Sequence, residues 1–260
     1  MKVVILAGGL GTRISEESEL RPKPMVTIGG KPILWHIMKT YSSFGHNDFI
    51  ICLGYKGDII REYFNNLMLY SSDVTIDYTK GGKMDTHKHW SEPWRVSLIE
   101  TGRDTMTGGR VKRIEKFIED DTFLLTYGDG VSDVNINASI ELHKKSRAAL
   151  TVTAVRLKPR FGALDIDGGG IVTRFKEKDI MDESWINGGF MVADKSVFSY
   201  LNGDNDIFEG EPMNRMVADG KVAAYQHEGF WQPMDTLRER QELERIWAEG
   251  NAPWKLWEDR

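Results

Sequence analysis

The sequence predicts an α/β fold built on a mixed, mostly parallel sheet that is flanked by helices. Short apolar runs alternate with helical patterns over residues 1–155, which is typical of successive βα units. Beyond that point the pattern changes to hairpins, so we expect an α+β region that packs onto the same sheet. No linker or change of composition separates these two halves, and we therefore expect one domain over residues 1–260.

The individual elements follow from apolar spacing and turn residues. In the first half we expect strands at 2–6, 49–53, 122–127 and 150–155, and helices at 33–41, 58–69, 107–119 and 136–145. Between them, β-like pieces at 74–78 and 95–100 flank a polar, aromatic segment at 83–90, which is typical of a functional or interface insertion. In the second half, a hairpin at 163–166 and 171–175 surrounds three glycines, and a last helix is expected at 236–247.

The composition excludes several classes of protein. The chain has 34 Lys and Arg against 39 Asp and Glu, and this acidic balance argues against a basic face that binds nucleic acid. No apolar run approaches the roughly 20 residues of a membrane-spanning helix, and the apolar start is far too short for a signal peptide. The single cysteine, Cys52, lies in an apolar run, so we expect a buried thiol in a cytoplasmic protein.

A glycine-rich loop directly follows the first strand. Its glycines let the backbone turn sharply and bring N–H groups close to phosphate oxygens, while an arginine adds a fixed cationic fork. A dinucleotide fingerprint would need a glycine where Ile14 stands, and the Walker motif is absent, so the alternatives are another phosphate cradle or an ordinary βα turn. The residues of this loop are Leu6, Ala7, Gly8, Gly9, Leu10, Gly11, Thr12 and Arg13.

A lysine between two prolines strengthens the phosphate interpretation. Pro22 and Pro24 stiffen the backbone around Lys23, so its ammonium is carried on a preset loop and suits a phosphoryl group whose charge changes during transfer. Taken together, the GGxGTR and PKPM motifs resemble the sugar-nucleotide pyrophosphorylase (nucleotidyltransferase) family. This resemblance implies a Rossmann-like nucleotidyltransferase fold, with residues of about 1–155 binding the nucleotide and about 156–260 binding a sugar phosphate and ending in the last helix.

Two aspartates are candidates for metal binding. Asp129 lies between two glycines just past a strand, and Asp235 precedes the last helix. The residues alone favour a turn residue for Asp129 and an N-cap for Asp235 over metal binding. The family resemblance implies instead that the two carboxylates jointly hold Mg²⁺, which favours hard oxygen ligands and substrate phosphates.

The resemblance also implies a set of substrate contacts. Glu177 and Lys178 would bind the hydroxyls and phosphate of the sugar, with Tyr127, Asn187 and Gly188 in the same cleft. On the nucleotide side it implies Gly128, Gly109 and the position of Asp104. An acidic side chain beside a triphosphate is unfavourable unless it faces away or reaches the base or ribose.

The activity implied is nucleotidyl transfer from a nucleoside triphosphate to a sugar 1-phosphate. Within the family, the resemblance of further segments implies CTP and α-D-glucose 1-phosphate as substrates, and these segments are residues 31–38, 107–110, 127–130, 160–165 and 229–236. In that reaction Arg13, Lys23, Asp129 and Asp235 would be the catalytic residues, and the product would supply deoxysugar and O-antigen synthesis. The resemblance further implies a homo-oligomer, a trimer or hexamer. Three alternatives stay open. The first is another nucleotide such as dTTP, or another sugar such as a phosphorylated heptose. The others are a catalytically silent nucleotide-sensing subunit and a nicotinamide-binding domain.

Other residues are given ordinary structural roles. His87 and His89 would share a strand face, but no third nitrogen or sulfur ligand lies nearby, so we expect no zinc site. Among the eight tryptophans, Trp35 and Trp247 fit helical core stripes. The remaining candidates, which we assign to a subunit interface, are Trp90, Trp94, Trp254 and Trp257.

Overall fold

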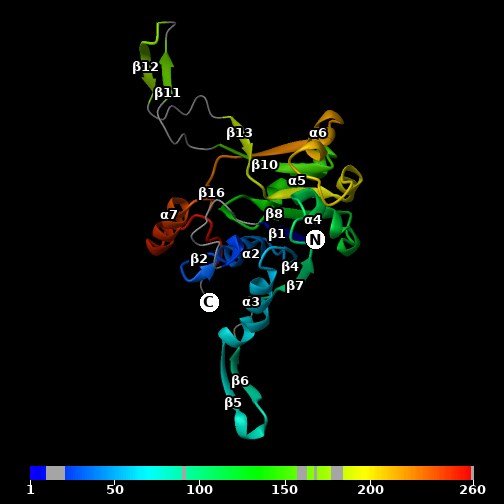
Figure 1. Ribbon diagram of the computed structural model, residues 1–260, viewed down its shortest axis with the longest axis vertical. Coiled ribbons are helices and arrows are strands. Elements are labelled where there is room, and N and C mark those ends of the chain that lie inside the picture. Colours follow the sequence, from blue (N-terminus) through cyan, green and yellow to red (C-terminus); the bar gives the residue numbers. More distant parts are fainter. Residues whose placement is uncertain (10–20, 90–91, 157–162, 167–168, 177–183, 259–260) are drawn as a thin grey trace.

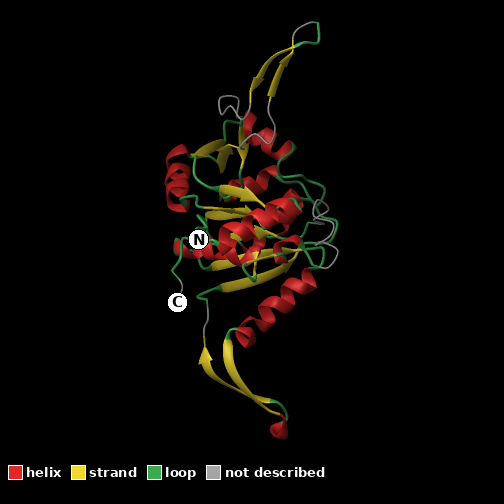
Figure 2. Cartoon of the chain, turned by 90° about the vertical axis from the view of Figure 1, so that its left-hand side faces the viewer, coloured by secondary structure: helices red, strands yellow, loops and turns green. Residues whose placement is uncertain are grey.

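A central sheet forms the body of the protein, and two hairpins extend from opposite ends of it (Figure 1). The structure is a computed structural model and describes residues 1–9, 21–89, 92–156, 163–166, 169–176 and 184–258. Helices lie on both sides of the sheet (Figure 2). The predicted α/β class with a mixed, mostly parallel sheet is therefore confirmed.

The main sheet takes strands from both halves of the chain. Its order is β13-β10-β14-β8-β1-β4-β7, and β15 pairs with β10. Strands β8, β1, β4 and β7 are parallel neighbours, as are β10 and β15, whereas β14 is antiparallel to β8 and β10. The strands are β1 (Val3–Leu6), β4 (Asp48–Leu53), β7 (Arg95–Glu100), β8 (Thr122–Tyr127), β10 (Leu150–Arg156), β13 (Trp185–Asn187), β14 (Met191–Asp194) and β15 (Val222–His227).

Alternation along the central strands divides the apolar side chains between two cores. In β1, Val3 and Ile5 belong to one core, while Val4 and Leu6 belong to the other. Both faces are covered, which is why β1 is an unbroken apolar run and not an alternating one. The sequence pattern therefore identifies β1 as a central strand.

The helices complete these two layers. Residues of α2 and α7 contribute to the core that contains Val3, and residues of α4 and α6 contribute to the core that contains Val4. The α-helices are α2 (Ile33–Ser43), α3 (Gly57–Tyr70), α4 (Thr107–Arg113), α5 (Ile136–Ser146), α6 (Glu211–Ala218) and α7 (Leu237–Ala248). The described residues also form the short 3₁₀ segments η1 (Lys23–Met25), η2 (Tyr78–Lys80), η3 (Glu115–Phe117) and η5 (Lys195–Tyr200).

Four small two-stranded units surround the main sheet. One is the hairpin of β5 (Ser72–Asp77) and β6 (Lys83–His89), and another pairs β11 (Ala163–Ile166) with β12 (Val172–Lys176), which was predicted. These two hairpins project in opposite directions (Figures 1 and 2). The others pair β2 (Thr27–Ile28) with β3 (Lys31–Pro32), and β9 (Gly130–Ser132) with β16 (Trp231–Pro233).

The structure corrects three expectations. The helix expected at 107–119 ends at Arg113 and continues as η3, because Ile114 leaves the helical range with φ −95° and ψ 0°. The polar segment 83–90, which shows no clean periodicity in the sequence, is largely the strand β6 and pairs with β5, while its role in function or at an interface stays a prediction. Trp254 is fully buried in the core, so its assignment to a subunit interface is wrong.

Two other expectations concern cysteine and membrane helices. Cys52 is buried, as predicted, and burial raises the pKa of its thiol to about 12. Among the helices of the described residues, none is long and apolar enough to cross a membrane.

A buried histidine fixes the layer formed by α2 and the C-terminal segment. His36 Nε2 lies 2.9 Å from the Ile28 carbonyl oxygen, and its Nδ1 accepts a hydrogen bond from Trp254 Nε1 at 3.3 Å. These two contacts require a neutral ring with the proton on Nε2, because an indole N–H can only donate. Burial is the main cause that lowers the pKa of His36 to about 4.

This histidine makes the stability depend on pH. Between about pH 6.5 and 4 the unfolded chain binds a proton at His36 and the native protein does not, so acidification favours unfolding. From pH 7 to 5 the free energy of unfolding should fall by about 2 kcal/mol more in the native sequence than in His36→Gln. Urea unfolding at the two pH values measures this difference, and equal losses in both proteins would contradict it.

Candidate active site

The carboxyl ends of two neighbouring parallel strands position the first part of the site. Strands β1 and β8 are paired in register from Val3 with Leu124 to Leu6 with Tyr127. The loop after β1 therefore begins beside the loop after β8, which carries Asp129. In open α/β sheets this edge is where ligands bind.

A glycine brings the Lys23 loop against this edge. The amide of Gly128 donates to the Leu6 carbonyl oxygen at 3.0 Å, and a Cβ on Gly128 would lie 3.0 Å from Pro24 Cγ. A larger residue at position 128 would push η1 away from β8. The expected proline-stiffened loop is thus a 3₁₀ turn whose residues Lys23, Pro24 and Met25 are all buried.

A second small pair of strands brings Asp235 to Asp129. Strand β9 follows Asp129 and β16 precedes Asp235, and their antiparallel pairing places Gly130 opposite Pro233. The amide of Met234 also donates to the Asp129 carbonyl oxygen at 2.8 Å. These contacts explain how aspartates from distant parts of the sequence reach one place.

The cap of α7 is made by the residue after Asp235. The Thr236 side chain accepts from the Glu239 amide at 3.2 Å, and Glu239 accepts from the Thr236 amide at 2.9 Å, forming a capping box. The interpretation of Asp235 as the N-cap is therefore wrong. Its carboxylate faces the ammonium of Lys23 instead.

Lys23 joins the two carboxylates. Its Nζ donates to Asp129 Oδ2 at 2.6 Å and to Asp235 Oδ1 at 2.5 Å, and its side chain is only 10% exposed. Burial alone would lower the pKa of Lys23, but the two carboxylates outweigh burial and raise it. The ammonium is therefore charged at neutral pH and holds the three side chains together.

The two carboxylates fit a magnesium ion. Their oxygens converge on a single cationic atom, which demonstrates that they can be shared by one cation. Among the described residues no group of three or more His, Cys, Asp or Glu side chains could hold a metal ion. Two carboxylates with the remaining positions left to phosphate oxygens and water match the usual binding of Mg²⁺.

Arg110 connects the ends of several strands, a role that no local sequence pattern predicts. Its guanidinium donates to the carbonyl oxygens of Gly8 at 2.9 Å, Leu53 at 3.1 Å and Gly102 at 2.7 Å. It also donates to the Thr101 hydroxyl and the Arg103 carbonyl oxygen, and it is 4% exposed. One side chain thus ties together the loops after β1, β4 and β7.

The first glycines of the loop after β1 have different neighbours. A Cβ on Gly8 would lie 2.2 Å from Arg110 Nη1, so glycine is required there for the arginine to approach. A Cβ on Gly9 would meet no atom of the described residues within 4 Å, so packing against them does not require that glycine. Leu6 and Ala7 are buried. The other predicted members of this loop, Leu10 to Arg13, lie outside the described residues.

Two of the predicted sugar contacts lie together. Asn187 Nδ2 donates to the Tyr127 hydroxyl at 3.4 Å, and Trp231 Nε1 donates to the Gly188 carbonyl oxygen at 2.7 Å. Glu209, which the sequence did not suggest, accepts hydrogen bonds from the hydroxyls of Tyr127 and Thr107. Burial and this carboxylate raise the pKa of Tyr127, so its hydroxyl stays protonated. Glu177 and Lys178 lie outside the described residues.

The two remaining candidates for nucleotide binding, Asp104 and Gly109, differ in their exposure to solvent. Asp104 is exposed in the loop after β7. Gly109 is buried in α4, where a Cβ would lie 2.6 Å from the Asp204 backbone, and its amide donates to the Asp206 carbonyl oxygen at 3.2 Å. Close packing therefore already accounts for Gly109, and its nucleotide contact stays a prediction.

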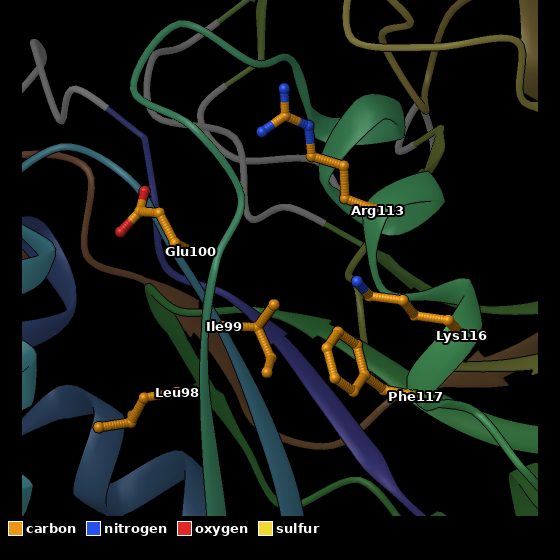
Figure 3. Close-up of a pocket in the computed structure, with 6 residues that line it drawn as sticks. All are labelled: Leu98, Ile99, Glu100, Arg113, Lys116 and Phe117. Atoms are coloured by element: carbon orange, nitrogen blue, oxygen red, sulfur yellow. The ribbon is translucent and has the colours of Figure 1, made fainter.

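A depression of about 400 Å³ lies at the edge of the sheet and contains none of these residues (Figure 3). Strand β7 forms one side of it, and α4 and η3 form the other. Arg113, one of its two cationic side chains, is paired with Asp204 at 2.6 Å. Its lining consists of Leu98, Ile99, Glu100, Arg113, Lys116 and Phe117.

Comparison with known proteins identifies the family of the chain. The family model described as nucleotidyl transferase matches residues 2–259. The chain belongs to the nucleotidyl transferase family. The predicted resemblance is therefore confirmed at the level of the family.

Individual relatives cover almost the whole chain. Glucose-1-phosphate cytidylyltransferase from Salmonella typhi is 53% identical over 99% of this chain and 100% of its own length. D-glycero-alpha-D-manno-heptose 1-phosphate guanylyltransferase from Campylobacter jejuni is 29% identical over 76% of this chain and 78% of its own length. The crystal structure of HddC from Yersinia pseudotuberculosis, 26% identical, superposes with a TM-score of 0.68 over 95% of this chain and 99% of HddC.

The Arg110 contacts predict a large effect from a conservative change. Lys cannot reproduce the fork of a guanidinium, so Arg110→Lys loses several hydrogen bonds that a buried charged group makes to backbone oxygens. The free energy of unfolding should fall by about 3 kcal/mol, as measured by urea unfolding.

A matched control is available three residues along the same helix. Arg113 pairs with Asp204 at the surface, so Arg113→Lys should cost less than about 1 kcal/mol. Equal losses for the two variants would show that Arg110 does not support the strand ends in this way.

Proposed function

We propose that this protein transfers the cytidylyl group of CTP to α-D-glucose 1-phosphate and so makes CDP-glucose and pyrophosphate. The observation that carries the proposal is the convergence of Lys23, Asp129 and Asp235 beside the loop after β1. The choice of substrates is supported by the name of the relative with 53% identity over its full length.

The chemistry needs charge neutralisation more than a general base. An oxygen of the sugar phosphate attacks the α-phosphorus of CTP, a new P–O bond forms, and the bond to the leaving pyrophosphate breaks. The attacking phosphate is already an anion, so no proton has to be removed, and the barrier comes mainly from aligning two polyanions. When bound, Mg²⁺ would neutralise phosphate charge and hold the reacting oxygens in line.

Each residue of the site has its own role in this proposal. Asp129 and Asp235 hold the metal ion, and Lys23 neutralises charge that develops at the α-phosphorus. Arg13 neutralises the leaving pyrophosphate. In this proposal residues of about 1–155 bind the nucleotide, and the sugar phosphate contacts come from both sides of that boundary, namely Tyr127, Glu177, Lys178, Asn187 and Gly188.

Two other functions are less well supported. The guanylyltransferase relative shares only 29% identity, which favours CTP over GTP, and dTTP is the remaining alternative within the class. A silent nucleotide-sensing subunit would not need a lysine and two carboxylates held within hydrogen-bond distance.

We further propose that the partner of this chain is a second copy of itself, in the predicted trimer or hexamer. The projecting β5–β6 hairpin exposes Ile76, Tyr78 and Met84, whose side chains are 40%, 81% and 40% exposed. Isolated two-stranded hairpins are marginally stable, so a partner that covers these side chains is favoured. Light scattering should give a mass of three or six times 29.6 kDa, and the mass of a single chain would contradict the proposal.

A panel of substrates tests the proposed activity. Pyrophosphate release should be fastest with CTP and glucose 1-phosphate and should require Mg²⁺, among CTP, dTTP, UTP and GTP tested with several sugar 1-phosphates. No pyrophosphate release with any pair would contradict the assignment as an enzyme.

The aspartates are tested in the same assay. Asp129→Asn and Asp235→Asn should each lower turnover by roughly 100-fold or more, because each loses a charged metal ligand. Asp120→Asn is the control and should keep full turnover, because Asp120 is an exposed aspartate whose partner is the amine of Met1. Unchanged turnover in both Asp129→Asn and Asp235→Asn would show that the two aspartates have no role in the mechanism.

A further inference from the structure

In this structure the cation between Asp129 and Asp235 belongs to the protein itself. Lys23 Nζ lies 2.6 Å from one carboxylate and 2.5 Å from the other, so the oxygens expected to bind a metal ion already share an ammonium. We propose that Lys23 keeps the metal site closed in the free protein, and that a divalent cation enters only with a nucleoside triphosphate that draws Lys23 away. This inference rests on the proposed function, since it takes Asp129 and Asp235 as the metal ligands.

The ammonium and a divalent cation compete for the same position. The two carboxylate oxygens that pair with the ammonium are the oxygens that would hold the metal ion, so a metal ion shared by both would lie beside the Lys23 nitrogen. The Lys23 side chain is 10% exposed, so little water separates the two charges, and their repulsion is strong. Binding of the metal ion therefore requires Lys23 to leave.

Lys23 is also the member of the group that can move. Asp129 is held by the hydrogen bond from Met234 to its carbonyl oxygen, and the Asp235 amide donates to Glu239 Oε2 at 2.8 Å. The backbone of Lys23 is fixed by its neighbouring prolines, but its side chain has four rotatable bonds. The ammonium can therefore leave the carboxylates while the backbone of η1 stays in place.

A triphosphate supplies what the metal ion alone cannot. If a free metal ion displaced Lys23, the ammonium would lose both of its carboxylate partners in a largely buried position, which is costly. Phosphate oxygens offer new partners to Lys23 and further ligands to the metal ion. The two ligands should therefore bind with positive coupling, and each should raise the affinity for the other.

Direct metal binding tests this inference without reference to turnover. Mn²⁺ serves as the probe, and electron paramagnetic resonance of the full chain measures its unbound fraction. In the absence of nucleotide, Lys23→Met should bind Mn²⁺ at least about 10-fold more tightly than the native sequence. Lys23→Gln is a second neutral variant and should behave in the same way.

Two control variants separate this effect from general loss of a lysine. Lys39 is 11% exposed and pairs with Glu92 at 3.0 Å, so Lys39→Met removes a similarly buried lysine elsewhere and should leave Mn²⁺ affinity unchanged. Lys23→Arg keeps a cation between the carboxylates and should bind Mn²⁺ as weakly as the native sequence.

The outcomes distinguish this inference from the proposed function. Suppose that the native sequence and Lys23→Met bind Mn²⁺ with equal affinity, and that Asp129→Asn abolishes this binding in both. That result would support the metal site and overturn the role of Lys23. Binding of Mn²⁺ with a non-reactive CTP analogue that is unaffected by Asp129→Asn and Asp235→Asn would overturn the metal site itself.

Discussion

The ion pairs that Lys23 makes with Asp129 and Asp235 connect three parts of the chain that are far apart in sequence. Each carboxylate needs a cation because two negative charges this close repel each other, and the buried ammonium needs both carboxylates because it has little access to water. In the free protein the three side chains therefore form one network of ion pairs. A polyanionic substrate and a divalent cation can exchange with that network without leaving a buried charge alone.

The rest of the structure keeps these three side chains in register. Strand β8 delivers Asp129, the β9 and β16 pair delivers Asp235, and the close contact at Gly128 sets η1 beside both. Arg110 donates to the carbonyl oxygens of Gly8, Leu53 and Gly102 at the ends of three strands, and so connects the segments that leave the sheet there. The acidic overall charge of the protein says little about its ligands, because the relevant charges are those gathered at this one edge.

The sequence predicted the parts of this arrangement that depend on local pattern. Strand β1, the proline-flanked Lys23 and the positions of Asp129 and Asp235 at element ends all follow from apolar runs and turn residues. The Lys23 contacts and the role of Arg110 depend on tertiary packing, which brings together residues from separate elements and has no local signal. The assignment of Trp254 to a subunit interface was wrong for a similar reason, because its buried partner His36 lies in a helix that is distant in sequence. The capping box at Thr236 and Glu239 was a local signal that could have excluded Asp235 as the cap.

The most direct test of the central claim is a crystal structure with Mn²⁺ and a non-reactive CTP analogue, in which anomalous scattering locates the metal ion. We expect manganese between the carboxylates of Asp129 and Asp235, with Lys23 Nζ moved onto a phosphate oxygen. Manganese bound by other residues, with Lys23 still paired to both aspartates, would contradict it.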